Sequence, residues 1–248
     1  MSENEERRRM VRPPKGGNAS GRGIGHTKLK TAKMRTLSSQ LWLERQLNDP
    51  FVVKAKAEGW RSRAAFKLIE IDERYGVLRR GQRVVDLGCA PGGWVQVALQ
   101  RGASRVVGVD LLPVDPIPGS EMIEADFTDP EVGPRLLAML DGPPDVIMSD
   151  MAHNTVGHKQ TDHIKIVVLI EMAMAFAEAN LAKGGTFVTK AFQGGETADL
   201  LRRLRATYTE VRHVKPKASR ADSSELYIIA MGFKGAQNAA QIPTEPLE

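Results

Sequence analysis

The chain has 248 residues, of which 42% are hydrophobic and 26% are charged, so it can form a hydrophobic core and is not disordered throughout. Its one cysteine, Cys89, excludes a disulfide framework and a thiolate metal cage. No stretch approaches the roughly 20 apolar residues of a membrane span, and the charged first ten residues lack the apolar segment of a signal peptide. We expect a cytoplasmic protein that does not associate with membranes.

The net charge of +5 is concentrated at the N-terminus. Residues 1–40 contain ten Lys or Arg and three Asp or Glu, a balance of +7, which leaves 25 basic and 27 acidic residues for the remainder, a balance of −2. A basic arm suits a polyanion such as nucleic acid, although a solubilising tail explains the charge equally well. Because the arm lacks apolar periodicity, we expect it to be flexible when free.

After the arm, strand-like segments alternate with helix-like segments. Strands are predicted at 83–87, 105–110, 122–125, 145–149, 186–190, 210–214 and 225–232. Helices are predicted at 62–75, 93–101, 130–140, 163–182 and 196–207. We therefore predict three parts, namely the arm at 1–40, one domain at 41–234 and a loose tail at 235–248.

The pattern of the strands predicts an α/β fold. Residues 106–109 and 146–148 are continuous apolar runs, which are typical of strands covered on both faces. Strands that alternate with helices favour right-handed crossovers and a Rossmann-like, doubly wound, mostly parallel sheet, here of seven strands. Ligands of such sheets bind beyond the carboxyl ends of the strands, so the functional residues should lie there.

The first predicted strand leads into a glycine-rich loop, Asp-Leu-Gly-Cys-Ala-Pro-Gly-Gly-Trp at 86–94. Gly88 allows close approach of a ligand to the backbone, but Ala90 breaks the dinucleotide fingerprint and no phosphate-loop motif is present. The second strand ends at Asp110, which suits ribose hydroxyls, and the third is followed by Asp126 and Phe127, which suit an adenine amine and ring. Each acid alone is also common in turns, but the ordered set favours S-adenosylmethionine.

Further charged residues, Lys67, Asp150, Lys190 and Glu225, lie at strand ends or in the helix before the sheet. They and Asp110 belong to specific sequence motifs. These motifs are Ser-Arg-Ala-Ala-Phe-Lys-Leu (62–68), Asp-Leu-Leu-Pro (110–113), Ser-Asp-Met-Ala (149–152), Lys-Ala-Phe-Gln-Gly (190–194) and Ser-Ser-Glu-Leu-Tyr (223–227). With the glycine-rich loop they resemble the FtsJ family of ribosomal RNA 2′-O-methyltransferases over roughly residues 48–233. The resemblance implies the class I methyltransferase fold with S-adenosylmethionine as cofactor.

The resemblance also implies the site and the substrate. The family's Lys-Asp-Lys-Glu catalytic tetrad falls on Lys67, Asp150, Lys190 and Glu225. Its cofactor-contacting positions fall on Gly92, Trp94, Asp110, Asp126 and Asp150. The implied reaction is methylation of a uridine ribose in large-subunit ribosomal RNA, on the RNA or on the ribosomal particle, and we expect a monomer without a metal.

The residue types suit this chemistry, because the enzyme mainly has to align a ribose oxygen with an activated methyl group. Lys190 is the predicted group beside that oxygen, where it either stabilises developing negative charge or, after losing its own proton, acts as a base. The sequence leaves both roles open. One departure concerns His153, which replaces the proline usual after Ser-Asp-Met-Ala in the family and thereby frees the backbone of this loop.

Several alternatives compete with this interpretation. His153, His158 and His163 are spaced five apart, which fits neither one helical face nor a usual zinc pattern. Cys89, inside the cofactor loop, suits packing better than the nucleophilic role it would have in a pyrimidine-C5 methyltransferase. Related enzymes with the same tetrad act on tRNA or on the mRNA cap, so these substrates remain alternatives. A non-catalytic ribosome-assembly factor is the hypothesis from another functional class.

RNA binding is expected to depend on phosphates. Besides the arm, residues 54–67 contain five basic and one acidic residue, and residues 201–220 contain seven basic and one acidic. Aromatic residues make up only 5% of the chain, which argues against a large base-stacking surface. Affinity should therefore be sensitive to salt, and selectivity should come from the shape of the folded RNA.

Deletion of residues 1–40 is expected to weaken RNA binding without changing cofactor binding, because the arm contains the excess positive charge. The two affinities can be measured separately, by titration with RNA and with S-adenosylmethionine at matched ionic strength. Equal RNA affinity with and without the arm would show that it is only a solubilising tail.

Overall fold

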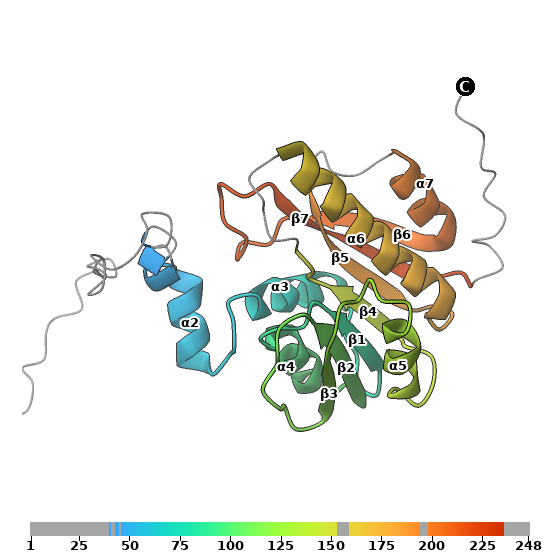
Figure 1. Ribbon diagram of the computed structural model, residues 1–248, viewed down its shortest axis with the longest axis horizontal. Coiled ribbons are helices and arrows are strands. Elements are labelled where there is room, and N and C mark those ends of the chain that lie inside the picture. Colours follow the sequence, from blue (N-terminus) through green and yellow to red (C-terminus); the bar gives the residue numbers. More distant parts are fainter. Residues whose placement is uncertain (1–39, 41–42, 45, 153–158, 194–197, 236–248) are drawn as a thin grey trace, which may run out of the picture. The chain divides into compact units, whose positions relative to one another are not determined.

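The computed structural model (Figure 1) describes residues 40, 43–44, 46–152, 159–193 and 198–235. The chain divides into two units, 1–48 and 49–248, and the sheet and helices given below belong to the second. Nearly all of the predicted arm and tail lies outside the described residues, as does His153 with the loop after Ala152. No helix in the described part is long and apolar enough to cross a membrane.

A seven-stranded sheet has the order β3-β2-β1-β4-β5-β7-β6. The strands are β1 (Arg83–Leu87), β2 (Arg105–Asp110), β3 (Ser120–Glu124), β4 (Val146–Ser149), β5 (Thr186–Phe192), β6 (Tyr208–Val214) and β7 (Glu225–Phe233). Strands β1 to β5 pair in parallel, and β7 is antiparallel to both β5 and β6. The predicted fold class, a mostly parallel α/β sheet, is confirmed.

Helices cover both faces of this sheet (Figure 1). These helices are α3 (Ala65–Tyr75), α4 (Gly93–Gln100), α5 (Val132–Ala138), α6 (Lys159–Asn180) and α7 (Ala198–Thr207), whereas α2 (Pro50–Glu58) packs against α3. Apolar side chains of α3 and α4 pack on one face, and those of α5, α6 and α7 pack on the other. Successive residues of a strand therefore enter different cores, as Val84 and Val85 do, which explains the continuous apolar runs.

Helix α2 was not predicted from the sequence, although its start carries a recognisable signal. Asp49 precedes it, and a side-chain oxygen of Asp49 accepts a hydrogen bond from the amide of Phe51 at 2.9 Å, while Pro50 occupies the first turn. Both are preferred at helix starts. The helix ends at Gly59, whose φ of 77° is left-handed. Its apolar positions do not form a clear stripe, which is why periodicity did not reveal it.

Candidate active site

The register of the sheet brings the predicted catalytic residues to one edge. Ser149 of β4 pairs with Thr189 of β5, so the next residues along these parallel strands, Asp150 and Lys190, are neighbours. Lys190 in turn pairs with Tyr227 of the antiparallel strand β7. Directly opposed residues project from the same face of a sheet.

The fourth predicted member, Lys67, comes from α3, the helix that covers this face. Glu225 begins β7, two residues before Tyr227, and so shares its face. All four members of the predicted tetrad are thus brought together, although they lie on four separate segments of the chain.

Charged groups of the tetrad are paired at short distances. Nζ of Lys190 lies 2.8 Å from Oδ1 of Asp150 and donates a second hydrogen bond to the backbone carbonyl oxygen of Asp150, also at 2.8 Å. Nζ of Lys67 lies 2.8 Å from Oε1 of Glu225, and 4.0 Å separate Nζ of Lys190 from the other carboxylate oxygen. Two cations and two anions therefore form one cluster.

Tyr227 joins the two halves of this cluster and was not among the predicted site residues. Its hydroxyl donates to Oδ1 of Asp150 at 2.6 Å and accepts from Nζ of Lys67 at 3.1 Å. The side chain is fully buried. The sequence carried one usable signal for it, since a residue two positions after Glu225 on a strand must point to the same side.

Burial and charge act together on the ionisation of this cluster. Burial by itself would raise the pKa of the Asp150 carboxyl, but the charges of Lys190 and Lys67 and the hydrogen bonds from Lys190 and Tyr227 bring it below its ordinary value. Burial, followed by the negative charges of Asp150 and Glu225, raises the pKa of Tyr227 well above its ordinary range. Tyr227 is therefore a neutral hydrogen-bonding group and Asp150 is an anion.

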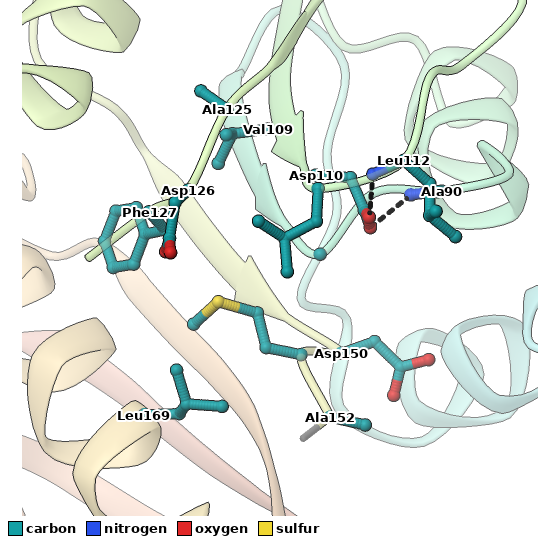
Figure 2. A pocket seen from close by; sticks show the side chains of 13 residues that line it. Ala90, Val109, Asp110, Leu112, Ala125, Asp126, Phe127, Asp150, Ala152 and Leu169 are labelled. Atoms are coloured by element: carbon teal, nitrogen blue, oxygen red, sulfur yellow. Dashed lines mark hydrogen bonds between the residues drawn. The ribbon is translucent and has the colours of Figure 1, made fainter. Parts of the chain in front are cut away.

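A cavity of about 380 Å³ opens beside the tetrad at the ends of β1, β2, β3 and β4 (Figure 2). Its lining combines glycine and acidic residues with apolar side chains, namely Gly88, Ala90, Val109, Asp110, Leu111, Leu112, Ala125, Asp126, Phe127, Asp150, Met151, Ala152 and Leu169. Five of the predicted cofactor residues are in this lining: Gly88, Asp110, Asp126, Phe127 and Asp150. Asp150 belongs to both the cavity and the tetrad, so the two sites are contiguous.

The acidic residues of the cavity are held by the backbone. Asp110 accepts hydrogen bonds from the amides of Ala90 and Leu112, both at 2.9 Å (Figure 2). Oδ1 of Asp126 accepts from the amide of Thr128 at 2.9 Å and from its hydroxyl at 2.8 Å, and these bonds lower the pKa of Asp126. Both side chains are therefore fixed acceptors at the cavity, as recognition of hydroxyl and amino groups requires.

Gly88 makes close contact between two loops possible. Its φ is +81°, and a Cβ atom at this position would lie 2.8 Å from the amide nitrogen of Met151. Any other residue would be strained there and would push Met151, which lines the cavity. The glycine is needed where the ends of β1 and β4 meet.

Gly92 and Trp94, the other two predicted cofactor residues, are not in the lining. Gly92 is the N-cap of α4 with φ at 105°. The indole Nε1 of buried Trp94 donates to the carbonyl oxygen of Ala64 at 2.9 Å, and the ring centroid lies 5.6 Å from that of Tyr227. Trp94 thus packs behind the tetrad, and direct contact of either residue with a cofactor stays a prediction.

The profile of the FtsJ-like methyltransferase family matches residues 60–233, which include every residue of the tetrad and of the cavity. The chain belongs to the FtsJ-like methyltransferase family. The resemblance inferred from the motifs is confirmed, and with it the assignment of the protein as a methyltransferase.

Three similar proteins match between 71% and 91% of the chain. The ribosomal RNA large subunit methyltransferase E of Caulobacter sp. strain K31 is 58% identical over 226 residues, 91% of this chain and 100% of the relative. The protein of the same name from Gluconobacter oxydans is 59% identical over 206 residues, 83% of this chain and 77% of the relative. A Plasmodium falciparum protein, described as a ribosomal RNA methyltransferase, has a crystal structure with a TM-score of 0.64 and 33% identity, covering 71% of this chain and all of that one.

Two ionisable side chains within the segment 86–94 of this FtsJ-like methyltransferase are buried. Asp86 on β1 is 0% exposed, and neither carboxylate oxygen has a hydrogen-bond partner among the described residues. Burial, followed by the charges of Asp150 and Asp110, raises the pKa of Asp86 well above its ordinary value. Burial likewise raises the pKa of the Cys89 thiol, so Cys89 is a neutral packing residue, as predicted. In the described part of the chain no group of acidic, His or Cys side chains is arranged to hold a metal ion.

We predict that Tyr227→Phe lowers the free energy of unfolding by about 1–3 kcal/mol, because Asp150 and Lys67 each lose a buried hydrogen bond. Denaturant unfolding at neutral pH measures this effect. Tyr208→Phe is the matched control, since the Tyr208 hydroxyl is buried without a hydrogen-bond partner in the described structure and its removal should cost nothing. Equal stability of both variants would contradict the bridging role of Tyr227.

We predict that Asp86→Asn flattens the pH dependence of stability. The folded protein keeps the Asp86 proton to a higher pH than the unfolded chain, whose ordinary pKa is 3.8. The folded state thus binds more protons, and stability falls as the pH rises from about 4 through the folded pKa. Urea unfolding from about pH 5 to about pH 8 should therefore show a smaller decline for Asp86→Asn than for the wild type, whereas Asp115→Asn, at an exposed position, should behave as the wild type. The same decline in all three proteins would refute a protonated Asp86.

Proposed function

We propose that this protein transfers the methyl group of S-adenosylmethionine to the ribose 2′-hydroxyl of a uridine in large-subunit ribosomal RNA. The observation that carries the proposal is the sharing of Asp150 by the cavity and the tetrad, because methyl transfer needs adjoining donor and acceptor sites. The names of the relatives at 58% and 59% identity support ribosomal RNA of the large subunit as the substrate.

The residues of the cavity fit S-adenosylmethionine. Asp110 is a fixed acceptor suited to the ribose hydroxyls, and Asp126 is suited to the exocyclic amine of adenine. Phe127, whose ring packs edge-on against Phe176 at 5.5 Å between centroids, offers an apolar surface to the adenine. At Gly88 the backbone can approach the ligand closely. When bound there, S-adenosylmethionine supplies a methyl group already activated by its sulfonium.

The tetrad's part in the reaction is to hold the acceptor oxygen and to stabilise its charge. Two hydrogen bonds to Asp150 fix the ammonium group of Lys190, so that its third proton can point to a ribose oxygen. Since Lys190 is only 8% exposed, its charge acts on the reacting oxygen with little screening by water. Lys67, held by Glu225, adds a second positive charge on the same side.

The proposal has consequences for partners and location. A protein acting on large-subunit RNA meets it on ribosomal particles in the cytoplasm, and it does so here as a monomer with the basic residues 1–40 as an additional RNA-binding segment. Because the RNA carries one charge per phosphate, binding through Lys and Arg should weaken steeply with salt.

The activity is tested with radiolabelled S-adenosylmethionine and three acceptors in parallel: undermethylated large ribosomal subunits, naked ribosomal RNA and tRNA. Hydrolysis of the labelled RNA with alkali then identifies the linkage, since a methylated 2′-hydroxyl protects it. Alkali-resistant label in the subunits or ribosomal RNA is expected. Label confined to tRNA would overturn the substrate, and cofactor binding without any transfer would overturn the enzymatic function in favour of a role in ribosome assembly.

We predict that Lys190→Ala lowers the rate of methyl transfer by about 100-fold or more, because the group beside the acceptor oxygen is lost. Affinity for S-adenosylmethionine should change little, since Lys190 does not line the cavity and Tyr227 still donates a hydrogen bond to Asp150 in the variant. Lys183→Ala, at an exposed position near the start of the same strand, is the control and should retain full activity. Wild-type transfer by Lys190→Ala would refute the assignment of Lys190.

A further inference from the structure

The segment between β6 and β7 contributes a serine to the tetrad that the mechanism above does not use. The hydroxyl of Ser219 donates to Oε1 of Glu225 at 2.7 Å. The same oxygen lies 2.8 Å from Nζ of Lys67, while Oε2 accepts from Lys67 at 2.9 Å. Ser219 is 7% exposed. Ser219 is thus a second donor that fixes the orientation of the Glu225 carboxylate.

The residues beside Ser219 are held on both sides. Its own amide donates to the carbonyl oxygen of Pro216 at 2.8 Å, which closes a turn. The amide of Lys217 donates to Oε2 of Glu70 at 2.7 Å. Ala218 is 1% exposed and packs with Ala55 of α2 and Phe66 of α3. This packing gives the serine one position relative to α3, which also carries Lys67.

An ion pair extends this arrangement to the start of α2. Arg63 hydrogen-bonds both to the carbonyl oxygen of Ala218 and to the carboxylate of Asp49. Arg220, the residue after Ser219, lies with its Nε 3.8 Å from the same carboxylate oxygen of Asp49. Asp49 is buried and is also the N-cap of α2. Both Asp49 and α2 precede residue 60, where the match to the family begins.

We propose that Ser219 is a positioning residue for methyl transfer: its hydroxyl orients Glu225 and thereby Lys67, and the Asp49–Arg63 pair holds the turn that presents this hydroxyl. The inference rests on the proposed function. A carboxylate with one donor fewer rotates about its last torsion, and Lys67 follows it, because Glu225 supplies both of its short carboxylate contacts. Neither Ser219 nor Glu225 lines the cavity, so cofactor binding does not depend on them.

The first test compares Ser219→Ala with Ser104→Ala. Ser104 is a suitable control because its exposed hydroxyl donates hydrogen bonds only to backbone carbonyl oxygens. Loss of one hydrogen bond to a charged group should lower kcat about tenfold. KM for RNA and Kd for S-adenosylmethionine should stay at the values of the Ser104→Ala control, while Tm should fall by a few degrees because a buried hydrogen bond is lost. A kcat within twofold of the wild type would overturn the proposal, and so would an equal loss of cofactor affinity, which would indicate a merely structural role.

The second test concerns the ion pair. Asn is as good an N-cap as Asp, so Asp49→Asn keeps the cap of α2 and removes only the charge that Arg63 binds. It should lower kcat by a smaller factor than Ser219→Ala does. The double variant should be no slower than Ser219→Ala alone, because both changes act through one hydroxyl. Multiplying effects would overturn the link between Asp49 and Ser219.

A crystal structure of Ser219→Ala tests the inference without an activity measurement. The Glu225 carboxylate is expected to be rotated or to occupy two positions, with Lys67 displaced, and an unchanged ion pair would overturn the proposal. An inactive wild-type protein would therefore contradict only the proposed function. An active wild type together with a fully active Ser219→Ala variant would contradict only the positioning role.

Discussion

Two buried lysines and two half-buried carboxylates meet at the edge of the sheet, and the pairing of their charges is the constraint on which the site depends. Lys190 lies between the carboxylates of Asp150 and Glu225. Glu225 in turn lies between the ammonium groups of Lys190 and Lys67. An unpaired buried charge is very costly, whereas a paired and hydrogen-bonded one is tolerated. Removal of any member deprives its neighbours of one opposite charge, so the four side chains stabilise one another as a set. Tyr227 adds the neutral hydrogen bonds that such a set needs.

This constraint also explains how catalysis and cofactor binding are connected. Asp150 faces the cavity and binds Lys190 at once. A shift of its carboxylate would disturb both sites, so the position of the lysine is fixed relative to the cavity wall. Proximity of this kind is worth several kcal/mol in a reaction whose main requirement is alignment. A rigid pair of charges is therefore more useful here than a strong acid or base.

Much of the fold and site could be predicted from the sequence, because parallel strands bring their carboxyl ends to one edge. Asp110, Asp150 and Lys190 all lie at the carboxyl ends of predicted strands, which placed them at one edge, and the family motifs grouped Asp150 and Lys190 in one tetrad. Contacts made by side chains across the fold were less predictable. Tyr227 meets Lys67 only once α3 has packed on β7, and Ser219 meets Glu225 only once the segment between β6 and β7 has folded back on the strand. No local sequence pattern encodes these contacts. Helix α2 was not predicted because much of its surface remains exposed, so its sequence needs no continuous apolar stripe.

The antiparallel direction of β7 determines where the protein can be extended. The strand starts at the functional edge with Glu225 and runs away from it, so that Phe233 lies at the opposite edge, where its amide bonds Gly185 before β5 begins. A parallel strand in this place would have ended at the charged cluster. The end of β7 is therefore remote from the charged cluster, whereas insertions between β6 and β7 would disturb the turn that holds Ser219 against Glu225. Changes at the first position should therefore leave the cluster intact, whereas changes at the second should alter it.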